Sequence, residues 1–296
     1  MIKFYNMKTM RFLFVFLALL ASTGLKAQDQ YVTPKAISDN PQYEARFRQI
    51  LDGFGQQMKH MGEVYNEIMA DSSLSSEKRS AKAKTIVYGL QAALMDSIST
   101  QIRNNSNTPI GSEILGIYYG NLSIGLVDTL LQGIPERCLT DKAREAKQLV
   151  EVKKLTAVGM NMIDFTQQTP DGKTLTLSQV VKANKLTLID FWASWCVPCK
   201  GEMPYVKKAY EAFKDKGFQI VGVSLDNKAD RWTKAIESWQ LPWLHVSDLK
   251  GWKCEPAALY GVRAIPASFL ISQDGKIVAV DLRGDALYNK LNEILK

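Results

Sequence analysis

The pattern of apolar and polar positions divides the chain into two parts. Up to about Lys154, apolar residues recur at three- and four-residue steps with charges between them, which is the period of amphipathic helices. Asn40-Pro41 opens the first predicted helix and Asp71-Ser72-Ser73 ends it. A second helix is predicted over about 76–102, and shorter helices follow near 111–121, near 123–132 and from Thr140 to about Thr156. The expected buried positions on the two long helices are Phe47, Ile50, Leu51, Phe54, Met58, Met61, Tyr65, Ile68 and Met69, then Ile86, Leu90, Leu94 and Ile98.

From about Asn161 the pattern changes to alternating strands and helices. Residues 186–192 form a nearly continuous apolar run, which is typical of a strand covered on both faces. The other predicted strands are 162–165, 174–177, 218–225, 243–246, 268–271 and 276–281, and the predicted helices are 196–214, 228–240, 255–260 and 285–295. Asp274-Gly275 is predicted to turn the chain so that 276–281 returns antiparallel to 268–271. This alternation predicts an α/β domain with a largely parallel central sheet and helices on both faces.

The N-terminus has the pattern of a secretory signal. A basic stretch precedes the apolar run 12–21, which is too short to span a bilayer and of the length expected for a signal core. We expect cleavage near Ala27, hence a signal peptide over 1–27 and export from the cytosol. A buried apolar helix or an uncleaved anchor remains the alternative.

Length and composition set the number of domains and exclude one class of partner. The 296 residues are 46% hydrophobic and 23% charged, which fits an ordinary globular chain of roughly two domains. We place a helical domain over 28–156 and an α/β domain over 157–296. The net charge is +7, but four of the 37 basic residues and no acid lie within 1–27. Because 33 basic against 30 acidic residues then remain without a clear basic patch, no nucleic-acid partner is expected.

The sequence Trp195-Cys196-Val197-Pro198-Cys199 carries the most specific chemistry. Cys196 is predicted at the N-terminus of a helix, where free backbone N–H groups and the helix dipole favour a thiolate. Cys199 follows one turn later and is close enough to resolve a mixed disulfide. A bridge that closes so short a loop removes little unfolded-state entropy, so it favours disulfide exchange over a structural role.

Two acids and one tryptophan accompany this predicted redox-active pair. Asp190 precedes Cys196 by six residues on the buried strand, so we expect it beneath the pair with a raised pKa, acting as general base and acid for Cys199. Glu202 follows Cys199 by three residues on the same helical face and is a candidate for tuning the pair. Their alternatives are a solvent-facing strand end for Asp190 and an ordinary exposed helix acid for Glu202. Trp195 is expected to be exposed beside Cys196 and to contact substrate.

The stretch from Asp190 to Cys199 resembles the thioredoxin-fold TlpA/ResA-like family of periplasmic thiol-disulfide oxidoreductases, relatives of the AhpC/TSA group. Pro204 resembles the family's helix-kinking proline, and Ile265-Pro266 resembles its cis-proline loop, which pairs with the substrate chain. Gly284 resembles the glycine that lets substrate approach the other side of that groove. Residues from about 226 to 260 resemble the family's helix–strand insertion. The helical half, including 107–111, resembles the region that precedes such domains in exported proteins.

The resemblance implies a partner set and a direction of electron flow. We expect protein disulfides as substrates, among them apocytochromes in cytochrome c maturation or misoxidised envelope proteins, and a membrane thiol-transfer protein as electron donor. No cofactor or metal is expected. A proline at position 198, between the two cysteines, resembles the motif of reductases more than that of strong oxidants. At positions 190 and 197 many members of the family carry a residue other than the Asp and Val of this chain.

Cys138 and Cys254 are expected to be free, buried thiols, with a bridge between them as an alternative. A zinc site built from all four cysteines lacks the second close-spaced pair that such sites usually show. His60 and His245 have no Ser or Cys arrangement typical of hydrolases.

These features favour an exported thiol-disulfide oxidoreductase, an α/β thioredoxin fold preceded by an all-α helical domain. A peroxiredoxin-like peroxidase is the alternative enzyme, but the Pro and Thr that normally precede a peroxidatic cysteine are missing. A binding or scaffold protein with an incidental dithiol is the non-enzymatic alternative. Our hypothesis for the helical domain is that it positions the groove or forms a homodimer through its long apolar faces.

Overall fold

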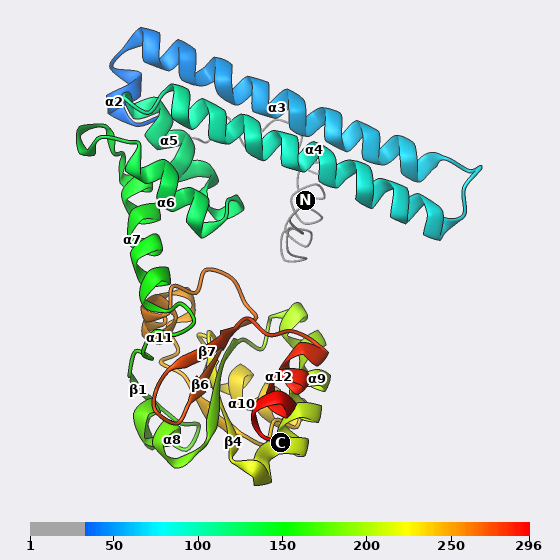
Figure 1. The fold of residues 1–296 in the computed structure, drawn as a ribbon, viewed down its shortest axis with the longest axis vertical. Helices are drawn as coiled ribbons and strands as arrows, with labels where there is room; N and C mark the ends of the chain where they lie inside the picture. The colour runs from blue at the N-terminus through cyan, green and yellow to red at the C-terminus, as the bar shows by residue number, and fades with distance from the viewer. Residues whose placement is uncertain (1–32) are drawn as a thin grey trace. The chain divides into compact units, whose positions relative to one another are not determined.

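The computed structural model describes residues 33–296, so the predicted signal peptide 1–27 lies outside the described residues. The chain divides into two compact units, Met1–Val150 and Glu151–Lys296 (Figure 1). Within the described range, no helix combines the length and the apolar character that crossing a membrane requires.

The first unit is helical in every regular element that the structure describes. Its two longest helices pack side by side (Figure 1), and Asn40 caps the first of them by accepting hydrogen bonds from the backbone N–H groups of Gln42 and Tyr43 at 3.0 and 3.2 Å. The elements are α2 (Lys35–Ser38), α3 (Pro41–Ala70), α4 (Ser76–Asn104), α5 (Pro109–Tyr118), η1 (Tyr119–Asn121), α6 (Ile124–Gln132), η2 (Glu136–Cys138) and α7 (Asp141–Leu155). The helices predicted from apolar spacing are all present.

The predicted apolar face of α4 is wrong at one position. Ile86 is 38% exposed, whereas its neighbour Val87 is buried together with Leu94 and Ile98. A helix turns by about 100° per residue, so a shift of one position moves a side chain off the packed face. The buried row is in phase with Ala83 and Val87, and Ile86 lies one residue away from it.

The second unit contains a five-stranded mixed sheet in the order β5-β4-β3-β6-β7. Strands β3, β4 and β5 run parallel, but β6 pairs antiparallel with β3, and β7 pairs antiparallel with β6. The prediction of a largely parallel sheet is therefore wrong for β6, which runs antiparallel beside β3, whereas the predicted antiparallel return of the last strand is confirmed. The elements are β1 (Thr166–Gln168), β2 (Thr174–Thr176), α8 (Leu177–Ala183), β3 (Leu186–Trp192), α9 (Val197–Phe213), η3 (Lys214–Lys216), β4 (Phe218–Ser224), α10 (Ala229–Ser238), β5 (Leu244–Val246), η4 (Gly251–Lys253), α11 (Glu255–Leu259), β6 (Ala267–Ser272), β7 (Ile277–Val280) and α12 (Asp285–Ile294).

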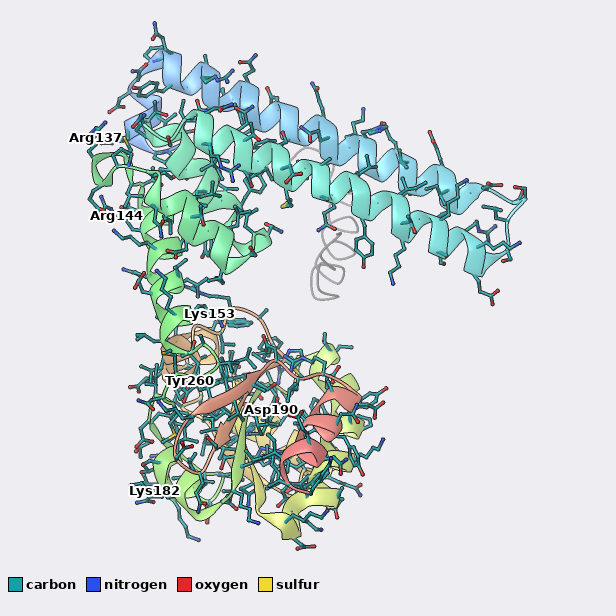
Figure 2. All side chains as sticks on the ribbon, viewed as in Figure 1. Arg137, Arg144, Lys153, Lys182, Asp190 and Tyr260 are labelled. Carbon is teal, nitrogen blue, oxygen red and sulfur yellow. A yellow bond between two sulfur atoms is a disulfide. The ribbon has the colours of Figure 1, made fainter. Side chains whose placement is uncertain are left out.

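The predicted strand over 162–165 is also wrong. The first strand is the polar Thr166–Gln168, which pairs with β2 outside the central sheet. The apolar segment before it is held in place without strand pairing. Phe165 is buried, and the Ile163 backbone bonds to the Tyr260 hydroxyl, which accepts from the Ile163 N–H at 3.0 Å and donates to the Ile163 carbonyl at 2.7 Å. Tyr260 itself is fully buried within this unit (Figure 2).

Strand β3 forms the centre of this unit and positions the loop that leads to α9. All seven of its residues are buried, as the apolar run predicts. Helix α9 begins directly after the loop 193–196, contains Pro204 in its interior, and packs beside α12 (Figure 1). The dithiol motif is thereby held at the end of the most deeply buried strand.

Candidate active site

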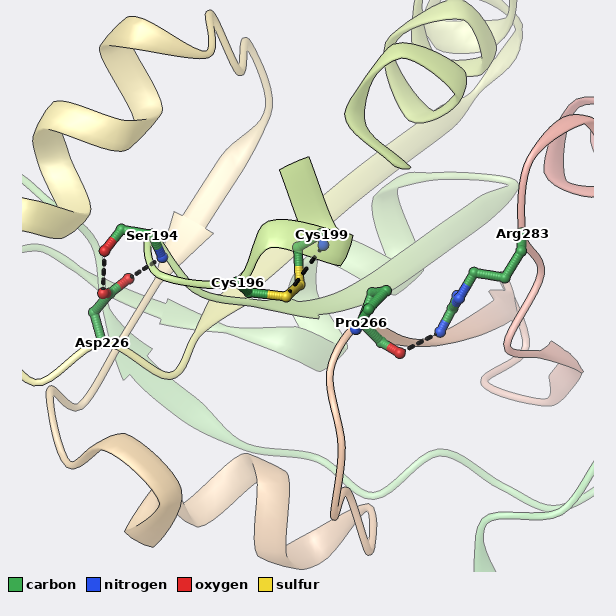
Figure 3. The surroundings of a disulfide bond; sticks show 6 residues. All are labelled: Ser194, Cys196, Cys199, Asp226, Pro266 and Arg283. Carbon is green, nitrogen blue, oxygen red and sulfur yellow. Dashed lines mark hydrogen bonds between the residues drawn. A yellow bond between two sulfur atoms is a disulfide. The ribbon is translucent and has the colours of Figure 1, made fainter. Parts of the chain in front are cut away.

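The Cys196–Cys199 pair forms a disulfide at the N-terminus of α9, with a Cα–Cα distance of 5.2 Å (Figure 3). Cys196 is the N-cap residue, and its Sγ accepts a hydrogen bond from the Cys199 backbone N–H at 3.1 Å. Pro198 lies in the first turn of α9, where a missing N–H leaves no hydrogen bond unmade. Residue Cys196 retains 4% of its surface exposed and Cys199 none, so Cys196 is the more accessible cysteine of the pair.

A buried carboxylate that the sequence analysis missed fixes the loop before Cys196. Asp226 accepts hydrogen bonds from the Ser194 N–H at 2.9 Å and from the Ser194 hydroxyl at 2.6 Å (Figure 3). It also accepts one from the Ser224 hydroxyl at 2.7 Å. Both Asp226 and Ser224 are buried. A carboxylate that accepts from three donors is a strong local restraint, so these hydrogen bonds hold the loop 193–196 that leads to the dithiol.

Asp190 is buried within β3, with 5% of its surface exposed, and is not a solvent-facing strand end. It lies opposite Gly222 of β4 and Ser268 of β6, and its Oδ2 has no hydrogen-bond partner among the described residues. Burial raises its pKa to about 6, the nearby Arg283 guanidinium opposes this shift, and the Glu202 carboxylate adds to it. A carboxyl with this pKa exchanges protons readily near neutral pH.

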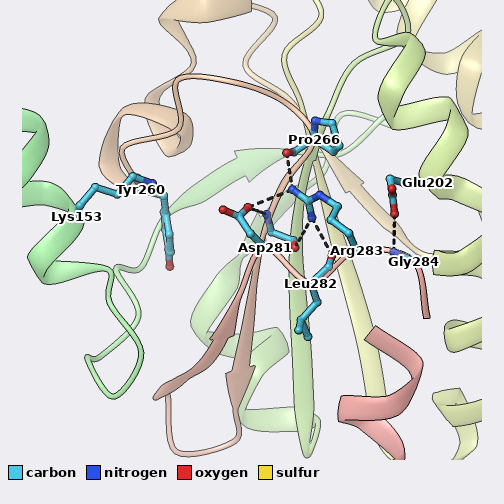
Figure 4. A network of polar contacts seen from close by, with 9 residues as sticks. Lys153, Glu202, Tyr260, Pro266, Asp281, Leu282, Arg283 and Gly284 are labelled. Carbon is cyan, nitrogen blue, oxygen red and sulfur yellow. Dashed lines mark hydrogen bonds and ion pairs between the residues drawn. The ribbon is translucent and has the colours of Figure 1, made fainter. Parts of the chain in front are cut away.

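Glu202 is a half-buried residue with a defined partner rather than an ordinary exposed helix acid. Its Oε2 accepts a hydrogen bond from the Gly284 backbone N–H at 2.9 Å (Figure 4). Gly284 precedes α12 with a φ of 56°, a left-handed conformation that favours glycine. The structure therefore links Glu202 and Gly284, two residues that the sequence analysis treated separately.

The Ile265–Pro266 peptide bond is cis, and both residues are half-buried. Arg283, which the sequence analysis missed, donates to the Pro266 carbonyl (Figure 4). Within residues 33–296, the backbone N–H and carbonyl of Ile265 have no hydrogen-bond partner. The backbone of this loop thus offers one donor and one acceptor for pairing with another chain.

An exposed aromatic ring, that of Trp195, lies beside Cys196 in the sequence. Trp195 is 47% exposed, which confirms its predicted exposure, and its ring lies 6.0 Å from that of Trp252, measured between centroids. Trp252, from η4, is itself 52% exposed. Two adjacent exposed tryptophans form an apolar surface that a substrate side chain can cover.

The remaining cysteines and histidines are not part of this site. Cys138 and Cys254 are free and buried, as expected for small apolar side chains, and burial raises the pKa of the Cys254 thiol to about 11. His245 is buried, and burial lowers its pKa to about 4. In the part of the chain that the structure describes, no cluster of His, Cys, Asp and Glu has the arrangement of a metal site.

Comparison with known proteins identifies the second unit. A family model of the AhpC/TSA family matches residues 158–280. Over 139 residues the chain is 30% identical to the thiol-disulfide oxidoreductase ResA of Bacillus thuringiensis subsp. konkukian, which covers 47% of this chain and 77% of that protein. The chain belongs to the ResA-like thiol-disulfide oxidoreductases. ResA of Bacillus subtilis is another relative, 30% identical over 128 residues, or 43% of this chain and 69% of that protein.

Membership of the ResA-like family confirms the predicted thioredoxin-like fold of the second unit and its oxidoreductase activity. Among solved structures, the thioredoxin domain of a thiol-disulfide oxidoreductase from Bacteroides vulgatus is 37% identical, and the match covers 47% of this chain and 99% of that chain with a TM-score of 0.44. The ResA-like relatives favour neither the peroxidase nor the scaffold alternative.

Proposed function

We propose that this protein is exported to the periplasm and reduces disulfides of envelope proteins through Cys196 and Cys199. The observation that carries this proposal is the position of the pair: Cys196, the cysteine that retains exposed surface, caps α9, and the fully buried Cys199 follows in the first turn of that helix. The basic and apolar pattern of residues 1–27 supports export, with cleavage near Ala27. The mature chain then consists of the helical domain 28–156 and the thioredoxin-like domain 157–296.

The proposed reaction is two consecutive thiol–disulfide exchanges. The Cys196 thiolate attacks one sulfur of the substrate disulfide, forms a mixed disulfide and releases the first substrate thiolate. Cys199 then attacks the Cys196 sulfur, which re-forms the Cys196–Cys199 disulfide and releases the second substrate thiolate. The substrate gains two electrons and two protons, and the enzyme dithiol loses both. A thiol donor, which we propose to be a membrane thiol-transfer protein, returns the enzyme to the dithiol form.

Asp190 and Glu202 are proposed to control the protons of the second exchange. Asp190 accepts the proton of Cys199 as that sulfur attacks, because its raised pKa suits proton transfer near neutral pH. Glu202 tunes Asp190 through its negative charge and anchors Gly284 at one side of the substrate groove.

The substrate chain is proposed to bind in a groove beside Cys196. The unpaired backbone groups of Ile265, next to Pro266, would pair with the substrate backbone as an added strand does. Trp195 would cover apolar substrate side chains, and Gly284 would allow close approach on the opposite side. Substrates of this kind include apocytochromes and misoxidised envelope proteins. The helical domain is proposed to position this groove or to form a homodimer.

Trapping of the mixed disulfide tests the proposed order of attack. In cells that express the full chain, Cys199→Ser should accumulate mixed disulfides with envelope proteins because resolution is blocked, and Cys196→Ser should accumulate none. Cys254→Ser is the matched control for the loss of a buried thiol and should leave the pattern unchanged. Mixed disulfides that persist in Cys196→Ser would contradict the proposed order of attack. A protein isolated from cell fractions that still carries residues 1–27 would contradict the proposed export with cleavage.

A further inference from the structure

The segment Asp281–Gly284, between β7 and α12, connects both sides of the dithiol. On one side, the Gly284 N–H donates to Glu202, which lies one turn after Cys199 on α9. On the other side, the Arg283 guanidinium donates to the Pro266 carbonyl (Figure 4). Adjacent residues of one short segment therefore hold the helix that carries the dithiol and the loop that faces it.

A set of hydrogen bonds with defined geometry fixes the Arg283 side chain. Its Nη1 donates to the Ser268 hydroxyl at 3.0 Å and to the Leu282 carbonyl at 2.8 Å, and its Nη2 donates to Asp281 Oδ1 at 3.1 Å. Asp281 has a φ of 54°, and its Oδ1 also accepts from the Ser268 N–H at 3.2 Å. A planar guanidinium with several donors suits such a multi-point contact, which a lysine cannot reproduce.

The contact with Ser268 brings the Arg283 charge close to Asp190. Ser268 of β6 is the register partner of Asp190 of β3, and directly opposed residues of an antiparallel pair project on the same face of the sheet. Arg283 therefore reaches the face of the sheet that carries the buried Asp190 carboxyl.

Among residues 33–296, the two charged groups that act on Asp190 have opposite effects. Arg283 favours the ionised carboxylate, and Glu202 disfavours it. Asp281 is paired with Arg283. His245 of β5 lies in the same row of the sheet, two strands from Asp190, and its pKa of about 4 leaves it uncharged at neutral pH. Arg283 and Glu202 thus form an opposed pair of charges that acts on one buried acid.

We propose that Arg283 is a positioning residue with two effects: it holds the Pro266 loop for the substrate, and its charge keeps Asp190 ready to accept the Cys199 proton. This inference rests on the proposed role of Asp190 as the base of the resolving step. In that step the proton moves from the Cys199 sulfur to Asp190, while Cys199 bonds to the Cys196 sulfur and the substrate thiolate leaves. Glu202 is the opposing charge that limits the effect of Arg283.

The test is the pH dependence of insulin disulfide reduction by the full mature chain, with kcat and KM measured separately. Removing the positive charge in Arg283→Gln should move the acid limb of kcat to higher pH by about one pH unit, because ionised Asp190 becomes less favourable. Glu202→Gln should move the limb in the opposite direction. Arg283→Lys should restore the position of the limb but not KM, because lysine keeps the charge and loses the planar contact with Pro266.

Three controls separate this inference from its alternatives. Arg231→Gln removes the same charge from an exposed position of α10 and should leave the acid limb unchanged. The rate of Cys196 alkylation by iodoacetamide against pH measures any direct effect on the Cys196 thiolate. In an Asp190→Asn background, Arg283→Gln should no longer shift the limb but should still raise KM.

The outcomes distinguish the inference from the proposed function. If Asp190→Asn alone leaves the acid limb in place, Asp190 is not the base, and that part of the proposed function is wrong. If Asp190→Asn removes the limb but neither Arg283→Gln nor Glu202→Gln moves it, the proposed function stands and the inference is overturned. The inference is also overturned if Arg283→Gln still shifts the acid limb in the Asp190→Asn background. It is likewise overturned if Arg283→Gln shifts the pH profile of Cys196 alkylation by the same amount as the acid limb.

Discussion

Replacing Asp190 by Asn should stabilise the thioredoxin-like unit at neutral pH. Burial raises the pKa of Asp190 from 3.8 to about 6, so the folded state binds this proton more tightly than the unfolded state does. The free energy of unfolding of the native chain therefore falls as the pH rises from about 4 to about 6, and it contains no such penalty below that range. At 1.36 kcal/mol per pH unit, the ionised carboxyl costs about 3 kcal/mol above pH 6.

Tryptophan fluorescence measures this effect in the intact chain. All six tryptophans lie between residues 192 and 252, so their emission reports unfolding of the second unit alone. Urea unfolding of the disulfide form at several pH values should give equal stabilities for native chain and Asp190→Asn at pH 4 or below. By pH 7 the variant should be more stable by about 3 kcal/mol.

The matched control is Asp215→Asn, which removes an exposed carboxylate of the same unit. It should leave the difference between pH 4 and pH 7 as it is in the native chain. A stability gain for Asp190→Asn that does not change between these pH values would refute the reasoning. So would an Asn variant that is less stable than the native chain at pH 7, because the ionised carboxylate would then be stabilising.

Three further predictions concern the surroundings of the dithiol. Gly222→Ala should cost about 1–3 kcal/mol in urea unfolding, because its Cβ would lie 2.7 Å from His245 Nδ1 in a packed interior; no loss would show that the interior can relax. Ser194→Ala, which leaves Asp226 with fewer donors, should cost about 1–3 kcal/mol and slow insulin reduction; a change in neither quantity would contradict the role of this contact. Trp252→Ala should raise KM for insulin with little change in the attack of Cys196 on a small disulfide such as oxidised glutathione, and an unchanged KM would exclude Trp252 from the substrate surface.

Local patterns in the sequence were sufficient for elements that depend on neighbouring residues. The bounds of β3 follow from a nearly continuous apolar run, and the start of α9 follows from Cys196 as N-cap with Pro198 in the first turn. The apolar run before Thr166 was misassigned as a strand because burial in a loop and burial in a strand have the same composition. Instead, Ile163 and Phe165 both contact Tyr260, nearly 100 residues later in the chain.

The direction of strands and the polar contacts of the site depend on the tertiary structure. Nothing in the residues of β6 specifies that it pairs antiparallel with β3, so the parallel sheet was an incorrect extrapolation from the alternation of elements. Asp226 bonds to Ser194 across 32 positions, and Glu202 bonds to Gly284 across 82. The Asp281–Arg283 pair follows a strand end and resembles ordinary surface charge, so no local signal distinguishes it.

The reduction potential of the Cys196–Cys199 pair tests the central claim most directly. It should be measured in the mature chain with Cys138→Ser and Cys254→Ser, so that only one thiol pair can be oxidised. A reductase of envelope disulfides should have a potential near that of thioredoxin, about −270 mV. A value near about −120 mV, typical of strong thiol oxidants, would contradict the account and assign the protein to disulfide formation.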